Sequence, residues 1–170
     1  MIRELVSSKD VARRTAEIGS EIAEYYSGRD LLLVMVANGG VFFGSDLARN
    51  IKLDFPVDII AVSSYHNDQQ AEELVFRCPP KLDCSGKCVL LVDEVLDSGN
   101  TLAATAAEFI RRGAKEVKTA VLVTKERARS TSAVRKADWS CFNLPDVYLV
   151  GCGLDSNELY RNLDFLGVVE

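Results

Sequence analysis

Short apolar runs alternate with amphipathic segments along most of the chain, and each kind of segment predicts a different element. The apolar runs are rich in β-branched residues and have the length of strands, at residues 31–37, 57–63, 88–92, 117–123 and 147–150. Between them, three segments place apolar side chains at helical spacing, at residues 8–27, 41–50 and 101–112. Gly28 and Gly113 follow the first and the last of these segments, as is common at helix ends. Apolar strands that alternate with helices predict an α/β fold, with a central, mostly parallel sheet flanked by helices.

The alternation fails between residues 66 and 86, where polar residues and two prolines show no sustained periodicity. A loop of about twenty residues is uncommon within a compact domain and is typically a functional lid or a disordered segment. The chain contains no linker, repeat or low-complexity stretch that would mark a second domain. We therefore expect a single domain over residues 1–170, with a lid at about 64–86.

Composition and charge narrow the class of protein. A chain of 170 residues with 48% hydrophobic residues is long enough to bury the core of one globular domain. Its formal net charge is −5 and its Lys and Arg residues are scattered, so we expect no nucleic-acid partner. The apolar runs are far shorter than the roughly 20 residues that cross a bilayer, and the N-terminal stretch carries charge where a signal peptide is apolar. We expect a cytoplasmic protein that does not bind membranes.

Cysteine and histidine usage argues against a zinc site and against a histidine-based mechanism. The five cysteines include no CxxC pair, and the single histidine, His66, does not complete a zinc site with them at a recognised spacing. We interpret the cysteines as reduced thiols, most of them in the core. His66 stands where a predicted strand enters the polar segment, which does not favour a role as catalytic base.

The segment VLLVDEVLDSGNTL, at residues 89–102, carries the clearest chemical signal. Its apolar residues predict a buried strand, Asp93 and Glu94 stand at the carboxyl end of that strand, and a short DSGNT turn opens a helix. In open α/β sheets, ligands bind outside the carboxyl ends of the strands. A helix N-terminus next to Gly99 and two hydroxyl side chains suits an anion, because unpaired N–H groups and the helix dipole attract negative charge.

Commoner nucleotide-binding motifs do not explain this segment. Residues 39–45 have the glycine spacing of a P-loop, but Gly44 is followed by Ser45 and not by lysine, and no GxGxxG occurs in the chain. The alternative interpretation of Asp93 and Glu94 is that they are ordinary solvated charges or a cap for the turn. Two acids beside a phosphate site are better suited to binding sugar hydroxyls and a metal ion, so we favour a functional role.

The segment resembles the phosphoribosyl pyrophosphate signature of the type I phosphoribosyltransferases, in which an apolar strand, two acids and two apolar residues precede Asp-Thr/Ser-Gly-x-Thr. Further segments are similar to the hypoxanthine-guanine branch of that family: SSY at 63–65, VTKERAR at 123–129, LPDVYLVGCGLD at 144–155 and YRNL at 160–163. They occur in the family's order and the matches span residues 34–169. The resemblance implies the type I phosphoribosyltransferase fold, with a mobile lid and a small hood formed by about 137–170 and the N-terminal segment.

The same resemblance implies a purine salvage enzyme, which converts hypoxanthine and/or guanine plus phosphoribosyl pyrophosphate to the nucleoside 5′-monophosphate and pyrophosphate. Asp93 and Glu94 would bind the ribose hydroxyls, and Asp97 would face purine N7 as general base. The 5-phosphate would be held by the turn that follows, Ser98, Gly99, Asn100 and Thr101.

Residues further along the chain would bind the purine. Lys125 would donate a hydrogen bond to the 6-oxo group, a contact that favours 6-oxopurines over adenine. Tyr148 would stack on the ring, and the backbone of Leu149 would contact its edge. Without the matched context, Lys125 would be interpreted as an exposed lysine at a strand end and Tyr148 as a core aromatic residue.

The pyrophosphate and a magnesium ion would complete the site. Asp155 would help to ligate Mg²⁺ beside the acids of the signature, and Arg161 and the Asn38-Gly39 loop would approach the pyrophosphate. The lid residues Ser64 and Tyr65 would close over it and exclude water, because the activated sugar is otherwise open to hydrolysis. The alternative roles are a surface ion pair for Arg161 and a turn cap for Asp155.

Two departures from the branch affect these expectations. The branch usually has lysine where this chain has Asn38, which predicts weaker binding of pyrophosphate, and its acids are commonly Glu-Asp or Asp-Asp where this chain has Asp93-Glu94. In the lid, HNDQQAEE at residues 66–73 replaces a small, Ser/Thr/Gly-rich stretch.

Other functions remain open at this point. A phosphoribosyl pyrophosphate-sensing regulator would keep the phosphate site without turnover, and adenine, orotate or uracil transferases would share it without the lysine and the hood. Preference among hypoxanthine, guanine and xanthine depends on backbone contacts to the purine 2-position. From the resemblance we expect a homo-oligomer, either a dimer or a tetramer.

Overall fold

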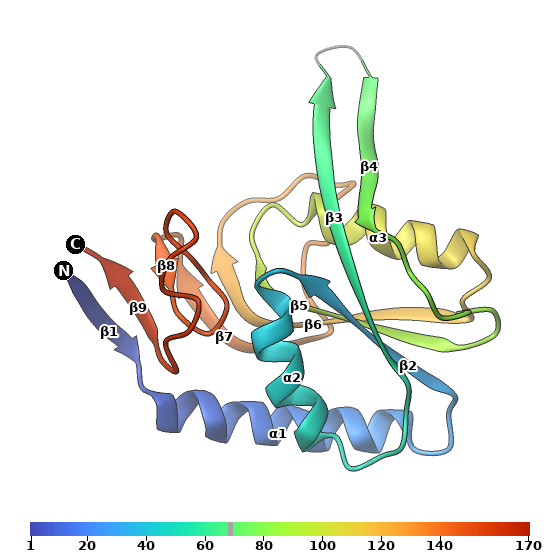
Figure 1. Ribbon diagram of the computed structural model, residues 1–170, viewed down its shortest axis with the longest axis horizontal. Helices are drawn as coiled ribbons and strands as arrows, with labels where there is room; N and C mark the ends of the chain where they lie inside the picture. The colour runs from blue at the N-terminus through green and yellow to red at the C-terminus, as the bar shows by residue number, and fades with distance from the viewer. Residues whose placement is uncertain (68–69) are drawn as a thin grey trace.

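A computed structural model describes residues 1–67 and 70–170, without the side chains of residues 64–74. Within these residues the chain forms a six-stranded sheet, a three-stranded sheet and helices that pack on the larger sheet (Figure 1). The strands are β1 (Ile2–Val6), β2 (Leu31–Ala37), β3 (Val57–Asn67), β4 (Gln70–Cys78), β5 (Cys88–Leu96), β6 (Glu116–Glu126), β7 (Trp139–Pro145), β8 (Leu149–Val150) and β9 (Leu166–Val169). The helices are α1 (Ser8–Tyr26), α2 (Gly40–Asn50) and α3 (Asn100–Arg111).

The larger sheet is mostly parallel, as the sequence predicted. Its strand order is β4-β3-β2-β5-β6-β7, and every neighbouring pair is parallel except β3 and β4. From β2 the chain passes through α2 to β3, whereas from β5 it passes through α3 to β6 on the other side. The strand order therefore reverses between β2 and β5, and such a switch point leaves a crevice at the carboxyl ends of the two strands.

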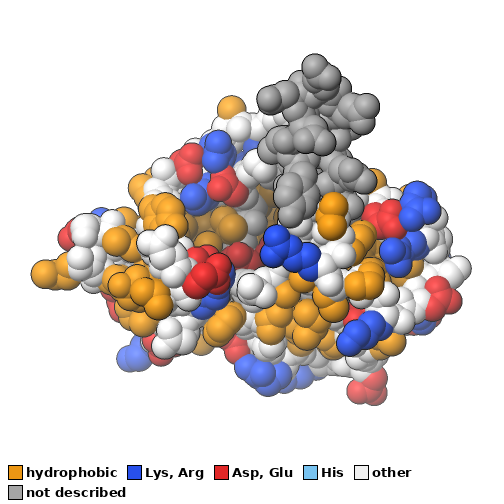
Figure 2. All heavy atoms as spheres, turned by 45° about the horizontal axis from the view of Figure 1, so that its top comes forward, with side chains coloured by type: hydrophobic (Ala, Val, Ile, Leu, Met, Phe, Trp, Pro, Cys, Tyr) orange, Lys and Arg blue, Asp and Glu red, His pale blue; other side chains and the backbone are white. Residues whose placement is uncertain are grey.

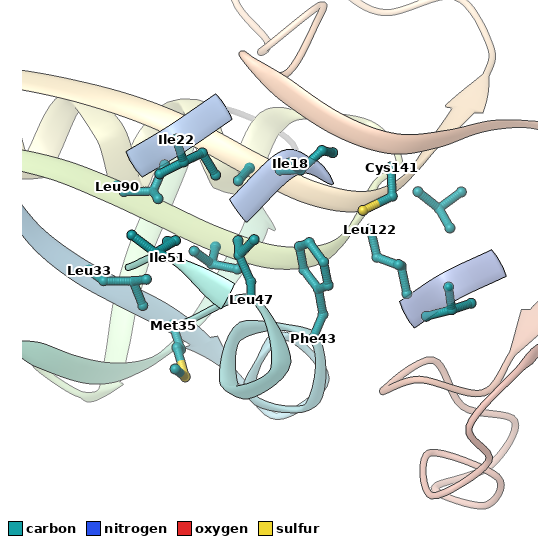
Figure 3. Close-up of a cluster of buried hydrophobic side chains, with 14 of the residues drawn as sticks. Ile18, Ile22, Leu33, Met35, Phe43, Leu47, Ile51, Leu90, Leu122 and Cys141 are labelled. Atoms are coloured by element: carbon teal, nitrogen blue, oxygen red, sulfur yellow. The ribbon is translucent and has the colours of Figure 1, made fainter. Parts of the chain in front are cut away.

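Helices cover both faces of this sheet, because successive side chains of a strand point to opposite sides. On one face, Leu33 of β2 packs in a buried cluster with Ile22 of α1 and Leu47 of α2 (Figure 3). On the other face, the next residue of β2, Val34, belongs to a second cluster with Phe109 of α3. The strand is apolar on both sides for this reason, which explains the continuous apolar run in the sequence.

The predicted helices are confirmed to within one residue at each end. Helix α1 begins after Ser7, whose hydroxyl accepts a hydrogen bond of 3.2 Å from the backbone N–H of Asp10.

All five cysteines are free thiols, and three of them are buried, which agrees with the predicted reduced, mostly internal cysteines. Among the described residues, no helix is both long and apolar enough to cross a bilayer. On the face shown in Figure 2, acidic and basic side chains are interspersed.

The sequence showed no strand pattern between residues 66 and 86, but the structure forms a strand in the first part of this segment. Strand β3 continues to Asn67, and β4 pairs with it antiparallel along the edge of the sheet, so that the two strands project from the body in Figure 1. The sequence did not reveal this strand because an edge strand is held mainly by backbone hydrogen bonds to its neighbour. It therefore needs no continuous apolar run. Beyond β4, the carboxylate of Asp58 accepts the backbone N–H groups of Lys81 and Leu82, at 2.7 and 2.9 Å.

The C-terminal third also differs from the sequence-based picture. Strand β7 joins the larger sheet beside β6, although the predicted hood began near residue 137. The predicted strand at 147–150 is reduced to β8, which belongs to the small sheet of β1, β9 and β8. Strands β1 and β9 were missed because each is short and pairs with a segment at the opposite end of the chain. Their pairing brings the termini together, and the backbone N–H of Glu170 donates to Met1 at 2.9 Å (Figure 1).

Candidate active site

A pocket of about 220 Å³ lies at the switch point, outside the carboxyl ends of β2 and β5. The walls come from β2, β3, β5 and the start of α3. Residues of the predicted site that line it are Asp93, Glu94, Asp97, Ser98, Gly99 and Thr101. The structure therefore brings the two acids, the predicted general base and most of the predicted phosphate turn to one place.

The turn between β5 and α3 depends on Gly99. Its φ of +80° lies in the left-handed region, which favours glycine, and it is the residue immediately before α3. The Gly99 carbonyl accepts hydrogen bonds from the backbone N–H groups of Ala103, at 3.0 Å, and Val134, at 3.1 Å. A side chain at Gly99 would overlap the carbonyl of Val134. The pocket thus receives the positive end of the α3 dipole, which suits a phosphate group.

The two acids lie against the loop that connects β2 to α2. Asp93 and Glu94 are half-buried, and the backbone N–H of Glu94 donates to Asp93 Oδ1 at 2.9 Å. A side chain at Gly39 would overlap the Glu94 carboxylate, and one at Gly40 would come within 3.1 Å of Asp93 Oδ1. Burial, and then the neighbouring Glu94 carboxylate, raise the pKa of Asp93 well above its ordinary value. Asn38, at the start of this loop, is exposed.

Four charged side chains meet where β5, β6 and β7 end. Nζ of Lys125 lies 3.9 Å from Oδ2 of Asp97 and 3.4 Å from Oδ1 of Asp146, and the lysine side chain is only 14% exposed. Nη1 of Arg127 donates a hydrogen bond to Oδ1 of Asp97, while its Nε lies 3.7 Å from Oδ2 of Asp146. The Asp97 carboxylate raises the pKa of Arg127. Positive and negative groups therefore alternate in a ring with no net charge.

The turns after β8 lie against the loop that follows β2. A side chain at Gly153 would overlap the backbone carbonyl of Gly39. Nη1 of Arg161 donates to the Gly153 carbonyl at 2.7 Å, and its Nη2 forms an ion pair of 2.9 Å with Asp155. The Asp155 carboxylate also accepts the backbone N–H of Glu158 at 2.8 Å. Both alternative roles, an ion pair for Arg161 and a turn cap for Asp155, thus occur, and they place the two residues beside the Gly39 loop.

Of the other predicted residues that the structure describes, Tyr148 and Leu149 are not among those that line the pocket. Tyr148 is 59% exposed, so its interpretation as a core aromatic residue is wrong. Leu149 is buried and pairs with Val168 in the small sheet. The side chains of Ser64 and Tyr65 lie outside the described part of the structure, as does that of His66.

Sequence reasoning gave no role to Arg127, Asp146 or Arg129, which the structure places around Asp97. The guanidinium of Arg129 donates to the backbone carbonyls of Asp97, at 2.7 Å, and Leu96, at 2.8 Å, and so ties the phosphate turn to the segment after β6. All three residues stand within the motifs quoted for the resemblance. Their charge was visible in the sequence, but their partners depend on how the strands are ordered in the sheet.

The carboxylates of Asp93 and Glu94 are of the kind that bind a hard divalent cation. Among the described side chains, no group of three or more His, Cys, Asp or Glu residues is arranged to hold a metal. Asp93 and Glu94 share the pocket, while Asp155 is engaged with Arg161. Mg²⁺ typically takes one or two carboxylates and completes its shell with phosphate oxygens and water, so this donor set is sufficient only together with a ligand.

A larger groove, of about 940 Å³, runs between α1, α2 and the turns after β8. It is lined by side chains such as Val11, Phe42 and Leu163, and by none of the predicted site residues. We assign the site to the smaller pocket because that pocket combines paired acids, a helix N-terminus and the switch point of the sheet.

Known proteins are similar to this chain in both sequence and architecture. The family model for the phosphoribosyl transferase domain matches residues 1–157. The hypoxanthine-guanine phosphoribosyltransferase of Streptococcus pneumoniae is 32% identical over 98% of this chain and 92% of that protein, and the enzyme of that name from Streptococcus agalactiae is 33% identical over the same shares.

Solved structures agree with these relatives. A hypoxanthine phosphoribosyltransferase from Staphylococcus aureus has a TM-score of 0.92 at 28% identity, covering 99% of this chain and 91% of that one. A hypoxanthine-guanine phosphoribosyltransferase from Bacillus anthracis has a TM-score of 0.88 at 29% identity, covering 99% of both chains. The resemblance and the fold class inferred from the sequence are confirmed. The chain therefore belongs to the phosphoribosyltransferases, a family of transferases, and to their hypoxanthine-guanine branch.

Proposed function

We propose that this protein transfers the 5-phosphoribosyl group of phosphoribosyl pyrophosphate to hypoxanthine, guanine or both, and releases pyrophosphate. The observation that carries the proposal is the pocket at the switch point, where Asp93 and Glu94 face the Gly99 turn and Lys125 lies 3.9 Å from Asp97. The names of the relatives support the choice of purine.

The ribose and its 5-phosphate would occupy the pocket itself. The carboxylates of Asp93 and Glu94 accept hydrogen bonds from the ribose hydroxyls. The 5-phosphate binds at the N-terminus of α3, where Ser98, Asn100 and Thr101 surround Gly99. The left-handed conformation of Gly99 supports this proposal, because it lets the backbone turn sharply into the helix.

The purine would lie beside the pocket, between the end of β6 and the small sheet. Lys125 donates to the 6-oxo oxygen. Its Nζ lies 3.4 Å from Asp146 and 3.9 Å from Asp97, and both distances are longer than that of a usual N–H···O hydrogen bond. The ammonium protons therefore remain available for a ligand. Asp97 accepts the proton of purine N7 as general base. The exposed ring of Tyr148 stacks on the base, and the backbone of Leu149 contacts its edge.

The pyrophosphate would leave toward the loop of Asn38 and Gly39, where Arg161 and Asp155 lie. Mg²⁺, held by Asp93, Glu94 and Asp155 together with substrate oxygens, would neutralise the charge that develops on the leaving group. Ser64 and Tyr65 of the predicted lid exclude water, since water would hydrolyse the activated sugar.

We also propose that the protein works in the cytoplasm as a homo-oligomer, a dimer or a tetramer. Five free thiols support a reducing compartment.

The side chain of Phe42, 42% exposed in the larger groove, supports an apolar contact surface between subunits. Light scattering on the purified protein measures the mass directly, and a monomer at micromolar concentration would contradict the oligomer.

A spectrophotometric assay tests the activity. The protein is incubated with phosphoribosyl pyrophosphate, Mg²⁺ and, separately, hypoxanthine, guanine, xanthine and adenine. We expect turnover of hypoxanthine, guanine or both. Asp97→Asn should lower kcat by about 10²-fold to 10⁴-fold, the usual contribution of a general base. Lys125→Ala should lower kcat/KM for 6-oxopurines by about 10-fold to 100-fold, because a hydrogen bond from a charged donor is lost.

The opposite end of the sheet supplies matched controls. Asp30 and Lys87 form an ion pair of 2.8 Å and immediately precede β2 and β5, at the strand ends that face away from the pocket. Asp30→Asn and Lys87→Ala should retain the activity of the unchanged protein. Binding of phosphoribosyl pyrophosphate without turnover of any purine would contradict the proposal and favour a sensor.

A further inference from the structure

The proposed general base is held on one side by an arginine that the proposed chemistry does not use. Nη1 of Arg127 donates to Oδ1 of Asp97. The second oxygen, Oδ2, is the one closer to Lys125, at 3.9 Å from Nζ, which is longer than a hydrogen bond. One oxygen of Asp97 is therefore occupied, and the other is open on the side of the lysine.

This arrangement matches the edge of a 6-oxopurine. The 6-oxo oxygen and N7 stand next to each other on that edge, one as an acceptor and the other as a proton donor. Recognition of both requires a positive donor and a carboxylate oxygen that are close to each other without being bonded. Lys125 Nζ and Asp97 Oδ2 meet this requirement only while the carboxylate is prevented from turning toward the lysine.

Arg127 also lies near a second carboxylate, that of Asp146. Its Nε lies 3.7 Å from Oδ2 of Asp146, whose other oxygen, Oδ1, lies 3.4 Å from Nζ of Lys125. Asp146 thus attracts both the lysine and the arginine, so that neither is paired with Asp97 alone. Because Arg127 and Asp97 are 42% and 45% exposed, their ion pair contributes little to folding. Its effect is on the direction of the Asp97 carboxylate.

We propose that Arg127 is a positioning residue, which binds Oδ1 of Asp97 and thereby aims Oδ2 at the N7 proton of the purine. The inference rests on the proposed function. In the step, the lone pair of purine N9 forms the bond to the anomeric carbon, and the bond from that carbon to the pyrophosphate oxygen breaks with its electron pair. The N7 proton passes to Oδ2, so that the purine ring of the product carries no charge. Arg127 touches none of the reacting atoms.

A double-mutant cycle tests this role. Arg127→Met removes the hydrogen bond and keeps the length of the side chain. It should lower kcat for the preferred purine by about 10-fold to 100-fold, the loss typical of a misplaced catalytic group, and leave the Kd of phosphoribosyl pyrophosphate unchanged. In an Asp97→Asn background the same substitution should have no further effect on kcat, because Arg127 acts only through that carboxylate.

Arg13→Met is the matched control. Arg13 is an exposed arginine of α1 that forms an ion pair of 2.7 Å with Glu17, and neither residue lines the pocket. Arg127→Met and Arg13→Met should unfold at the same temperature within a few degrees, so that a loss of kcat in the first variant is not a loss of folded protein.

Several outcomes would overturn the inference. An unchanged kcat in Arg127→Met would show that Asp97 needs no support. Equal fold losses in the wild-type and Asp97→Asn backgrounds would mean that Arg127 acts structurally, and a rise in kcat would mean that it obstructs Asp97. If the unchanged protein turns over purine, each of these results contradicts the role of Arg127 alone, whereas no turnover in the unchanged protein contradicts the proposed function as well.

Discussion

Gly153 of the C-terminal region packs on the backbone carbonyl of Gly39, in the loop that follows β2. The contact leaves no room for a side chain at position 153, and the φ of Gly153, +102°, also lies in the left-handed region. Arg161 reinforces the contact by donating to the Gly153 carbonyl at 2.7 Å. The small sheet and the pocket are therefore coupled through two backbone segments.

Gly153→Ala should impair both stability and substrate binding. We expect a loss of about 1–3 kcal/mol in the free energy of unfolding from the strained φ, and an added loss in affinity for phosphoribosyl pyrophosphate because the Gly39 loop must move. Urea unfolding and isothermal titration measure the two effects. Gly28→Ala is the control, since Gly28 has a φ of +73° but no atom within 4 Å of the added carbon. Equal effects of both variants on affinity would contradict the coupling.

Asn38→Lys should strengthen the binding of pyrophosphate. The side chain of Asn38 is exposed at the start of the Gly39 loop, so a lysine there fits without displacing the core and adds a positive charge near the proposed leaving group. We expect a decrease of about 2-fold to 5-fold in the Kd of pyrophosphate, the size of an exposed ion pair. Ser20→Lys adds the same charge on the exposed surface of α1. The same Kd in both variants would show that pyrophosphate does not bind at this loop.

The ion pairs of Glu108 predict a pH-dependent contribution to stability. Hydrogen bonds from Arg111, and then from Arg112, lower the pKa of Glu108 to about 2. Because the folded pKa lies below the unfolded value of about 4.3, the stabilisation is complete above that value and is lost as the pH falls toward 2. Glu108→Gln should therefore cost about 0.5–1 kcal/mol at pH 7, and less at pH 3. Urea unfolding at both pH values checks this, and a pH-independent difference would contradict it.

Burial should protect Cys141 from alkylation. Burial raises the pKa of the Cys141 thiol to about 12, so the reactive thiolate is scarce at pH 8. Cys78 is half-buried and more accessible. We expect iodoacetamide to label Cys78 before Cys141 in the folded protein, as measured by mass spectrometry of tryptic peptides. Protein unfolded in urea is the control, where both cysteines should react alike; equal rates in the folded protein would contradict the burial of Cys141.

The sequence by itself determined the local structure that builds the pocket. The apolar run before Asp93, the glycine of the turn and the helical spacing after it are neighbours along the chain, so periodicity and backbone preference predict strand, turn and helix in that order. The structure places this segment at the carboxyl end of a central strand, and four of the predicted residues around Asp97 and Gly99 face one pocket with the two acids. The parallel sheet followed from strands that are apolar on both faces.

Only the tertiary structure decided which distant segments meet. Strands β4 and β7 take their places through pairing with β3 and β6, which a weak local pattern does not reveal. The hydrogen bond from Arg127 to Asp97 forms because β5 and β6 lie side by side and end at the same edge of the sheet. The contact of Gly153 with Gly39 joins segments from opposite ends of the chain. Such contacts depend on the order of the strands and on backbone packing, which leave no periodic signal in the amino-acid sequence.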